Sequence, residues 1–527
     1  MQGTVLQSYP AIGVELEMVT TDVRSGNSLA VEGYFDALCD ARKARGLSPT
    51  IKRAGGRAVC VAMPDGSLST IDNGFNNLES CIGPISGPNA LFMLDQRIRA
   101  EMRDVQAALA VDGGAILNFA QHPDLTISQS IYRSFRAPKP IYDYWVDGRG
   151  WQHWVGIDAK AQNGANIDVH PRHAIRALNM LLAFSPMFIA LFANSPFEGG
   201  RVSGLKETRL TIWPRMFAAP TFGADRRQHI LPEAPFASLN AYFNWMFGGD
   251  TAMQIIPMIR TLDYKGAPNV ARVEGDPSFL TFLASDGMMA RQVGADDRSL
   301  LKPDPAHFEF LQFSHFLDAR FRWRFATYPS IEELRDALSG NIEALFERRA
   351  AGCYIEMRAA GANFPDAPFL NETPDDVGSS MVISVTALAI GLMRNLDAAE
   401  ELLTEIGWEA CRAAREPAIK HGLSGQIGSH SLREVSARII ELSSEGLPEA
   451  ERWALAYPAH VIRTGQNGAD RALTALNAAK GPESEGIRAV AASRIAVDPD
   501  FWSPPPRSPI VAAPPNQGAL AAPSMVS

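Results

Sequence analysis

The sequence predicts a chain of the α+β class, and three observations support this. Residues 11–19 alternate apolar and acidic side chains, which is typical of a strand with one buried face. Residues 58–63 and 66–71 resemble two short strands joined by a Pro-Asp-Gly turn. Residues 89–111 carry apolar side chains at helical spacing and end before an Asp-Gly-Gly stop signal.

The strand at residues 11–19 places Glu15 and Glu17 on the same side. Residues at this spacing lie ~6–7 Å apart, so their charges repel unless a cation lies between them. A divalent cation with oxygen ligands would relieve that repulsion. The alternative is a half-exposed strand with a solvated acidic face. Taken alone, the fragment favours this alternative, and other parts of the chain must decide.

The rest of the chain reads as further short strands and helices. We expect strands at residues 115–120, 161–169, 316–325 and 353–358, and a turn leading into a strand at 72–80. We expect helices at residues 32–45, 174–193, 237–258, 330–349, 377–394, 397–404, 432–442 and 471–479. Residues 128–156, rich in aromatic side chains and arginine, are expected to form a loop, either a lid or a segment packed on the core.

Composition limits the classes of protein that fit. The 527 residues carry a net charge of −9, so no nucleic-acid partner is expected. The five cysteines include no CxxC pair, which disfavours a zinc ribbon or a disulfide framework and suits a reducing cytoplasm. Residues 1–10 show no secretory signal. The apolar segment 174–193 contains Arg176 and Pro186, which favours a kinked, buried core helix over a membrane span.

One large domain is expected to occupy residues 1–503, with a helical C-terminal part at about 377–503. Residues 504–527, rich in Pro and Ala, are expected to be disordered. The sequence contains no Walker A loop, no dinucleotide fingerprint and no G-x-S-x-G elbow. An enzyme that uses a nucleotide would therefore have to hold the phosphates through metal ions and arginines.

Acidic residues recur within short apolar stretches that read as strands: Glu15, Glu17, Glu79 and Glu356. If these strands share a face, their carboxylates could converge on Mg²⁺, which prefers oxygen ligands. Arginines also lie in or beside strands, namely Arg320, Arg322, Arg324 and Arg358. Guanidinium groups suit bidentate contacts with phosphate or carboxylate. Ordinary cross-strand ion pairing explains the same pattern equally well.

Taken in order, several motifs resemble the glutamate–cysteine ligase family, in its plant and proteobacterial branch. The matching segments are Gly-Val-Glu-Leu-Glu (13–17), Leu-Glu-Ser (78–80), Asn-Ile-Asp (166–168), Ala-Leu-Phe-Ala-Asn-Ser-Pro-Phe (190–197), Arg209 with Ile-Trp (212–213), and Tyr-Ile-Glu-Met-Arg-Ala (354–359). The resemblance covers roughly residues 11–450.

This resemblance implies a glutamine-synthetase-like fold, with a curved, mainly antiparallel sheet that forms a funnel and helices packed behind it. It implies ATP-dependent formation of a γ-glutamyl amide through an acyl phosphate, with glutamate and cysteine as substrates, in cytoplasmic glutathione biosynthesis. The resemblance gives the metal ligands as Glu15, Glu17, Glu79 and Glu356, with Mg²⁺ as the cofactor. Arg209, Arg320 and Arg358 would hold phosphate or the glutamate carboxylate. We assign substrate binding to Asn166, Asp168 and Arg133.

Three departures from the family pattern concern the acceptor side. Gly164 stands where this branch carries a glutamine, and Pro214-Arg215-Met216 replaces an arginine followed by acidic residues. Residues 330–349 insert a helical stretch between the arginine strand and the Glu356 strand. The prediction of a γ-glutamyl ligase is therefore firmer than the prediction that cysteine is the acceptor.

Three other functions stay open at this point. A ligase could join glutamate, or another acid, to a different amine. A non-catalytic relative would bind a metabolite or a partner protein without turnover. A phosphagen-type kinase would release a stable phosphorylated product instead of an amide. The sequence does not indicate the oligomeric state.

Overall fold

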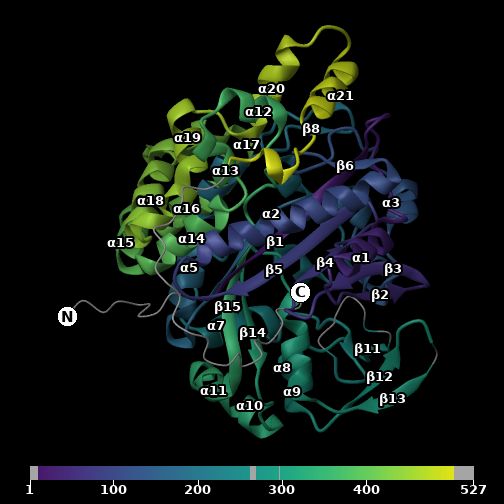
Figure 1. Cartoon of the computed structure of the whole chain (residues 1–527). Helices are drawn as coiled ribbons and strands as arrows, with labels where there is room; N and C mark the ends of the chain where they lie inside the picture. The colour runs from purple at the N-terminus through teal and green to yellow at the C-terminus, as the bar shows by residue number, and fades with distance from the viewer. Residues whose placement is uncertain (1–9, 262–266, 268, 296, 504–527) are drawn as a thin grey trace.

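The computed structural model describes residues 10–261, 267, 269–295 and 297–503, and within them nine strands form one large sheet (Figure 1). The strand order is β14-β15-β7-β1-β5-β4-β3-β2, with β6 paired to β1, and every pair is antiparallel. The strands are β1 (Ile12–Asp22), β2 (Thr50–Ala54), β3 (Arg57–Ala62), β4 (Leu68–Ile71), β5 (Asn77–Ile85), β6 (Gly114–Ile116), β7 (Asn163–Asp168), β14 (Ala319–Phe325) and β15 (Ala350–Met357). The predicted α+β class with a mainly antiparallel sheet is confirmed.

Most of the chain outside this sheet is helical (Figure 1). The first eleven helices are α1 (Tyr34–Ala44), α2 (Ala90–Leu109), α3 (Gln129–Phe135), α4 (Pro140–Asp143), α5 (Pro171–Phe192), α6 (Ile212–Met216), α7 (Leu239–Phe247), α8 (Phe279–Ala284), α9 (Pro305–Phe310), α10 (Ile331–Ser339) and α11 (Ile342–Arg349). The C-terminal helices are α12 (Ala367–Glu372), α13 (Asp375–Ser380), α14 (Ser384–Arg394), α15 (Leu396–Ile406), α16 (Trp408–Ala413), α17 (Arg415–His421), α18 (Leu432–Gly446), α19 (Ala456–Thr464), α20 (Gly468–Ala478) and α21 (Glu483–Ser493).

Strand β1 lies near the middle of the sheet and separates the core from the cavity. Val14, Leu16 and Met18 are fully buried on its apolar side, and α2 and α14 pack against this strand. Side chains alternate along a strand, so Glu15 and Glu17 point to the opposite face. The alternating pattern therefore places two carboxylates on a buried strand and not on a solvated face.

Helix α5 is the apolar helix of the core. It is long and apolar enough to cross a membrane, but 83% of its most apolar window is buried, and it packs on β14 and β15. No other helix in the described residues meets the same criteria. The prediction of a buried core helix is confirmed, and Pro186 lies inside the helix without ending it.

Several predicted elements differ from the structure, mainly because turn residues divide them. The expected single helix at 330–349 is two helices, because Asn341 caps α11 by accepting a hydrogen bond from the Ala344 amide. The expected helix at 377–394 is likewise divided into α13 and α14. The expected loop at 128–156 contains α3 and α4, and the expected strand at 115–120 is reduced to β6.

A second, four-stranded antiparallel sheet was not predicted at all. It consists of β10 (Ile256–Pro257), β11 (Val270–Val273), β12 (Met288–Gln292) and β13 (Arg298–Leu301). The predicted helix at 237–258 ends with α7, where Gly248 and Gly249 follow, and glycine is a poor helix former. The predicted disordered tail, 504–527, lies outside the described residues.

The Asn-Ser pair of the 190–197 motif forms a buried hydrogen-bond hub directly after α5. The side-chain nitrogen Nδ2 of Asn194 donates to Asn118 Oδ1 at 2.9 Å and to the Ala362 carbonyl at 2.7 Å. The guanidinium group of Arg494 donates to Oδ1 of Asn194 at 2.8 Å. The side chain of Glu207 accepts from the Asn194 backbone amide at 2.7 Å. Asn194 therefore joins segments from four distant parts of the chain.

We predict that Asn194→Ala lowers the free energy of unfolding by about 2–4 kcal/mol, because it removes several hydrogen bonds and leaves buried partners unsatisfied. Urea denaturation followed by circular dichroism measures this loss. Asn179→Ala is the control, since Asn179 makes two hydrogen bonds with the backbone of Phe236 at a less buried position. Equal losses in both variants would contradict the role of Asn194 as a hub.

Candidate active site

A cavity that is partly open to solvent lies on the face of the sheet that carries Glu15 and Glu17. Its walls are charged at one part and aromatic at another. The lining residues are Glu15, Glu17, Asp72, Asn73, Glu79, Tyr142, Trp145, His153, Ile157, Lys160, Trp213, Met216, Phe313, Phe316, Arg320 and Arg358.

Two of the predicted glutamates are direct cross-strand neighbours. In the β1–β5 pair, Glu17 lies opposite Glu79, and both are about 4% exposed. Like charges directly opposite each other destabilise a sheet, so this register requires nearby positive charge. The structure thus brings Glu17 and Glu79 together as the sequence predicted.

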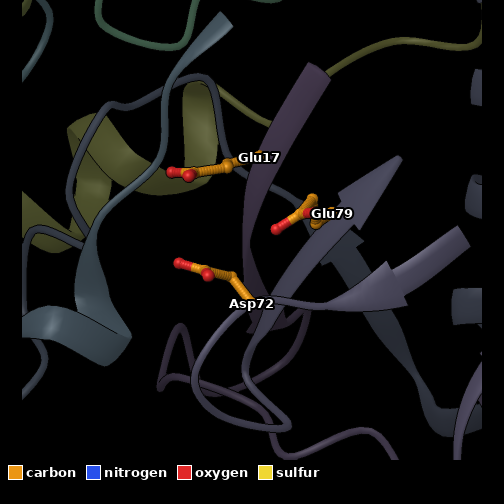
Figure 2. Close-up of side chains that lie close together, drawn as sticks. All are labelled: Glu17, Asp72 and Glu79. Atoms are coloured by element: carbon orange, nitrogen blue, oxygen red, sulfur yellow. The ribbon is translucent and has the colours of Figure 1, made fainter. Parts of the chain in front are cut away.

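Asp72 completes a group of three carboxylates (Figure 2). Glu17, Asp72 and Glu79 each offer an oxygen, and the three oxygens lie within 4.8 Å of one another. These hard oxygen donors fit Mg²⁺. Asp72 was not among the predicted ligands, because its Asp-Asn-Gly context indicated only a turn. Its position immediately before the Glu79 strand was the signal that could have identified it.

Lys160 is a second site residue that the sequence did not indicate. Its ammonium group lies 2.8 Å from both carboxylate oxygens of Glu17 and 2.8 Å from Oδ2 of Asp72. Burial alone would lower the pKa of Lys160, but Asp72 and Glu17 outweigh it and raise this pKa. A buried cation therefore lies within the carboxylate group.

Glu15 lies two residues before Glu17 on β1 and on the same face of the strand. Burial, followed by the charges of Glu356 and Glu79, raises the pKa of Glu15 to about 8. Asn166 on β7 donates a hydrogen bond to Glu15 at 3.3 Å, so this predicted substrate-binding residue contacts a predicted metal ligand. The nearby charges of Arg322 and Arg320 oppose this rise of the Glu15 pKa but do not cancel it.

Gly164 lies directly opposite Glu15 in the β1–β7 pair. A Cβ atom at this position would lie 2.8 Å from the carbonyl oxygen of Met357, closer than side chains normally approach. The glycine therefore keeps the backbones of β7 and β15 close together. The glutamine of the family pattern would not fit here without a shift of the backbone.

Glu356 has different surroundings from the other three glutamates. It lies 2.5 Å from Arg320, 2.7 Å from Arg358 and 3.3 Å from Arg322. Burial would raise the pKa of Glu356, but these three arginines outweigh it and hold the pKa below the usual range. Glu356 does not line the cavity and lies within an arginine cluster, so its predicted role as a metal ligand stays a prediction.

The three arginines assigned to phosphate or carboxylate binding fall in two places. Arg320 and Arg358 line the same cavity as the carboxylates. Arg209 is buried outside the lining, where it contacts Glu207 at 2.7 Å and donates to the carbonyl of Ala359 at 2.7 Å. It therefore supports the backbone immediately after Arg358, and its predicted phosphate contact stays a prediction.

Two predicted substrate-binding residues lie outside the cavity lining. Arg133 is exposed on α3. Asp168 lies at the end of β7, opposite Tyr354, and burial raises its pKa to about 7. Neither position brings its side chain to the cavity wall in this structure.

The other wall of the cavity is aromatic and held in place by packing. The rings of Trp213 and Phe316 lie 5.0 Å apart, and Trp145 stacks on Trp151 at 5.1 Å. The indole nitrogen of Trp145 donates to Gln254 at 2.9 Å. Burial, chiefly, lowers the pKa of His153 in this wall to about 3, so the imidazole is neutral. Trp145 and His153 come from the segment that sequence analysis described as a loop.

The fold of this chain is similar to that of one solved ligase structure. The glutamate–cysteine ligase of Francisella tularensis, determined in complex with AMP, is 12% identical, with a TM-score of 0.51 over 92% of this chain and 88% of that chain. A bifunctional glutathione synthetase from Pasteurella multocida is 12% identical over 92% of this chain and 51% of that chain, with a TM-score of 0.44. No curated protein matches this chain in sequence.

Residues 11–242, somewhat under half of the chain, match the sequence profile of the glutamate-cysteine ligase family 2 (GCS2). The resemblance that the motifs indicated is confirmed for these residues. The profile match includes Glu15, Glu17, Asp72, Glu79 and Lys160, but the Arg320 and Glu356 strands lie beyond it.

We predict that Asp168→Asn stabilises the protein above pH 7 and leaves the KM for each substrate within about twofold. The folded pKa is raised above the unfolded value near 3.8, so the wild type loses stability as pH rises from about 4 through 7. The asparagine variant lacks this loss, and its advantage at pH 8 should reach up to about 4 kcal/mol.

Thermal unfolding at pH 5 and pH 8, together with KM values, checks this expectation. A stability difference that is equal at both pH values would contradict the raised pKa. A large rise in KM would instead support the assignment of Asp168 to substrate binding.

Proposed function

We propose that this protein is an ATP- and Mg²⁺-dependent ligase that forms a γ-glutamyl amide through an acyl-phosphate intermediate. Glutamate is the proposed acid and cysteine the first candidate amine. The observation that supports this proposal is one cavity that combines Glu15, Glu17, Asp72 and Glu79 with cationic groups. Phosphoryl transfer depends mainly on positioning and on neutralising charge, and this cavity offers groups for both.

In this reaction the side-chain carboxylate of glutamate attacks the γ-phosphorus of ATP, and ADP leaves. The amine then attacks the acyl carbon, loses a proton, and displaces phosphate. Mg²⁺ held by Glu17, Asp72 and Glu79 would neutralise phosphate charge. Arg320 and Arg358, which line the same cavity, would bind the transferred phosphoryl group or the substrate carboxylate through their guanidinium groups.

Arg320 and Arg358 are held in position by their contacts with Glu356. Their guanidinium groups therefore need little reorganisation when a substrate binds, which favours electrostatic stabilisation of the transition state. All five cysteines are buried free thiols, which suits the proposed cytoplasmic location. With cysteine as the acceptor, the product would serve glutathione biosynthesis.

We predict that Glu15→Gln and Glu79→Gln each reduce ATP-dependent phosphate release by about 100-fold or more, because each removes one carboxylate from the phosphate-facing group. The measurement is phosphate release with glutamate, Mg²⁺ and a mixture of amines. Glu309→Gln is the matched control, since Glu309 is also a buried glutamate, with its pKa raised to about 7 by burial, but lies outside the cavity lining. Wild-type turnover in both cavity variants would refute the proposed site.

The aromatic wall supports a second candidate, in which the amine carries an apolar group the size of an aromatic ring. Trp145, Trp213 and Phe316 present flat, preorganised surfaces to the cavity. Such surfaces bind rings through stacking and edge contacts worth about 0.5–1.5 kcal/mol per pair beyond burial. The small thiol of cysteine would leave much of this wall without a partner.

Mass spectrometry of the products separates the two acceptors. If the second candidate holds, incubation with glutamate, ATP, Mg²⁺ and equal amounts of cysteine and phenethylamine yields mainly the phenethylamide. Phe316→Leu should then raise the KM for phenethylamine by about 5–10-fold and leave the KM for glutamate unchanged. Exclusive formation of γ-glutamylcysteine would reject the second candidate, and a stable phosphorylated product without amide would reject both.

A further inference from the structure

The position of Lys160 within the carboxylate group carries an inference beyond the reaction. Its ammonium group makes three contacts of 2.8 Å, two with Glu17 and one with Asp72. An ammonium group has three hydrogen-bond donors and no acceptor, so these contacts match its full donor capacity. The lysine therefore engages oxygens from two of the three carboxylates that face one another in Figure 2.

The charges of the group indicate what the lysine replaces. Glu17, Asp72 and Glu79 carry three negative charges when ionised, and Lys160 supplies one positive charge. Glu17 and Asp72 thus share one cation, which lies 2.8 Å from an oxygen of each. Without the lysine, these two carboxylates would repel each other unless another cation took its place.

The backbone fixes the lysine in this position. The side chain of Asn77, two residues before Glu79 on β5, donates to the Lys160 carbonyl. The two residues that flank Lys160 are held by backbone hydrogen bonds. The backbone amide of His122 donates to the Ala159 carbonyl at 2.8 Å, and the backbone amide of Ala161 donates to the Ala120 carbonyl at 2.8 Å. The side chain is only about 3% exposed, so moving the ammonium group away would leave a buried charge without its partners.

We propose that the Lys160 ammonium group is a built-in substitute for one divalent cation. It occupies the cation position between Glu17 and Asp72, and the carboxylate group therefore binds one divalent ion fewer than its carboxylates alone would accept. The inference rests on the carboxylate group of the proposed function as a cation site, but not on the identity of the acid or the amine. It makes Lys160 a positioning residue that holds the orientation of both carboxylates.

The test counts bound Mn²⁺ in the full chain without nucleotide, using the electron paramagnetic resonance signal of free Mn²⁺. We expect Lys160→Met to bind one more Mn²⁺ per chain than the wild type. Lys160→Arg, which keeps the charge, should keep the wild-type number. Circular dichroism establishes that each variant is folded, and Lys160→Gln takes the place of the methionine variant if that one does not fold.

The outcomes separate this inference from the proposed function. An equal number of Mn²⁺ ions in the wild type and in the charge-removing variant overturns the inference, even if the wild type is an active ligase. An additional Mn²⁺ in the arginine variant also overturns it, because the charge would then not be the cause. An additional Mn²⁺ only in the charge-removing variant supports the inference, even if no amide product is found.

Discussion

The register of β1 against β5 is the constraint on which the site depends. It sets Glu17 directly opposite Glu79, and this pairing of like charges is tolerable only because cationic groups surround it. Lys160 contacts Glu17 and Asp72, while three arginines surround Glu356 farther along the same sheet. The sheet thus places carboxylates and guanidinium groups in the lining of one cavity.

A buried network of hydrogen bonds supports this arrangement. The hub around Asn194 joins distant segments, and Glu207 connects it to Arg209. Arg209 in turn holds the backbone after Arg358, so the end of α5 is linked to the cavity wall. A motif can therefore be important for the site without contacting a substrate. This explains why the 190–197 segment belongs to the family pattern although Asn194 and Ser195 lie outside the cavity lining.

Much of the fold could be predicted because strand alternation and helical spacing are local properties. The β1 strand, the α2 helix and the apolar α5 helix follow directly from such patterns. The small β10–β13 sheet was missed because its strands are two to five residues long and carry little alternation. The break between α10 and α11 was missed because apolar spacing continues across Gly340 and Asn341, although this Gly-Asn pair is itself a helix-stop and capping signal.

For the site, the sequence by itself determined the residue types: acidic side chains on apolar strands and arginines on another strand, in an order that resembles one ligase family. Only the tertiary structure decided their partners. Glu356 belongs with arginines, Asp72 joins Glu17 and Glu79, and Lys160 lies between Glu17 and Asp72. The physical reason is that periodicity fixes which face of its own strand a side chain occupies. Which charges meet across strands depends on register and on contacts between segments as distant as those of Glu17 and Lys160, and no local pattern contains that information.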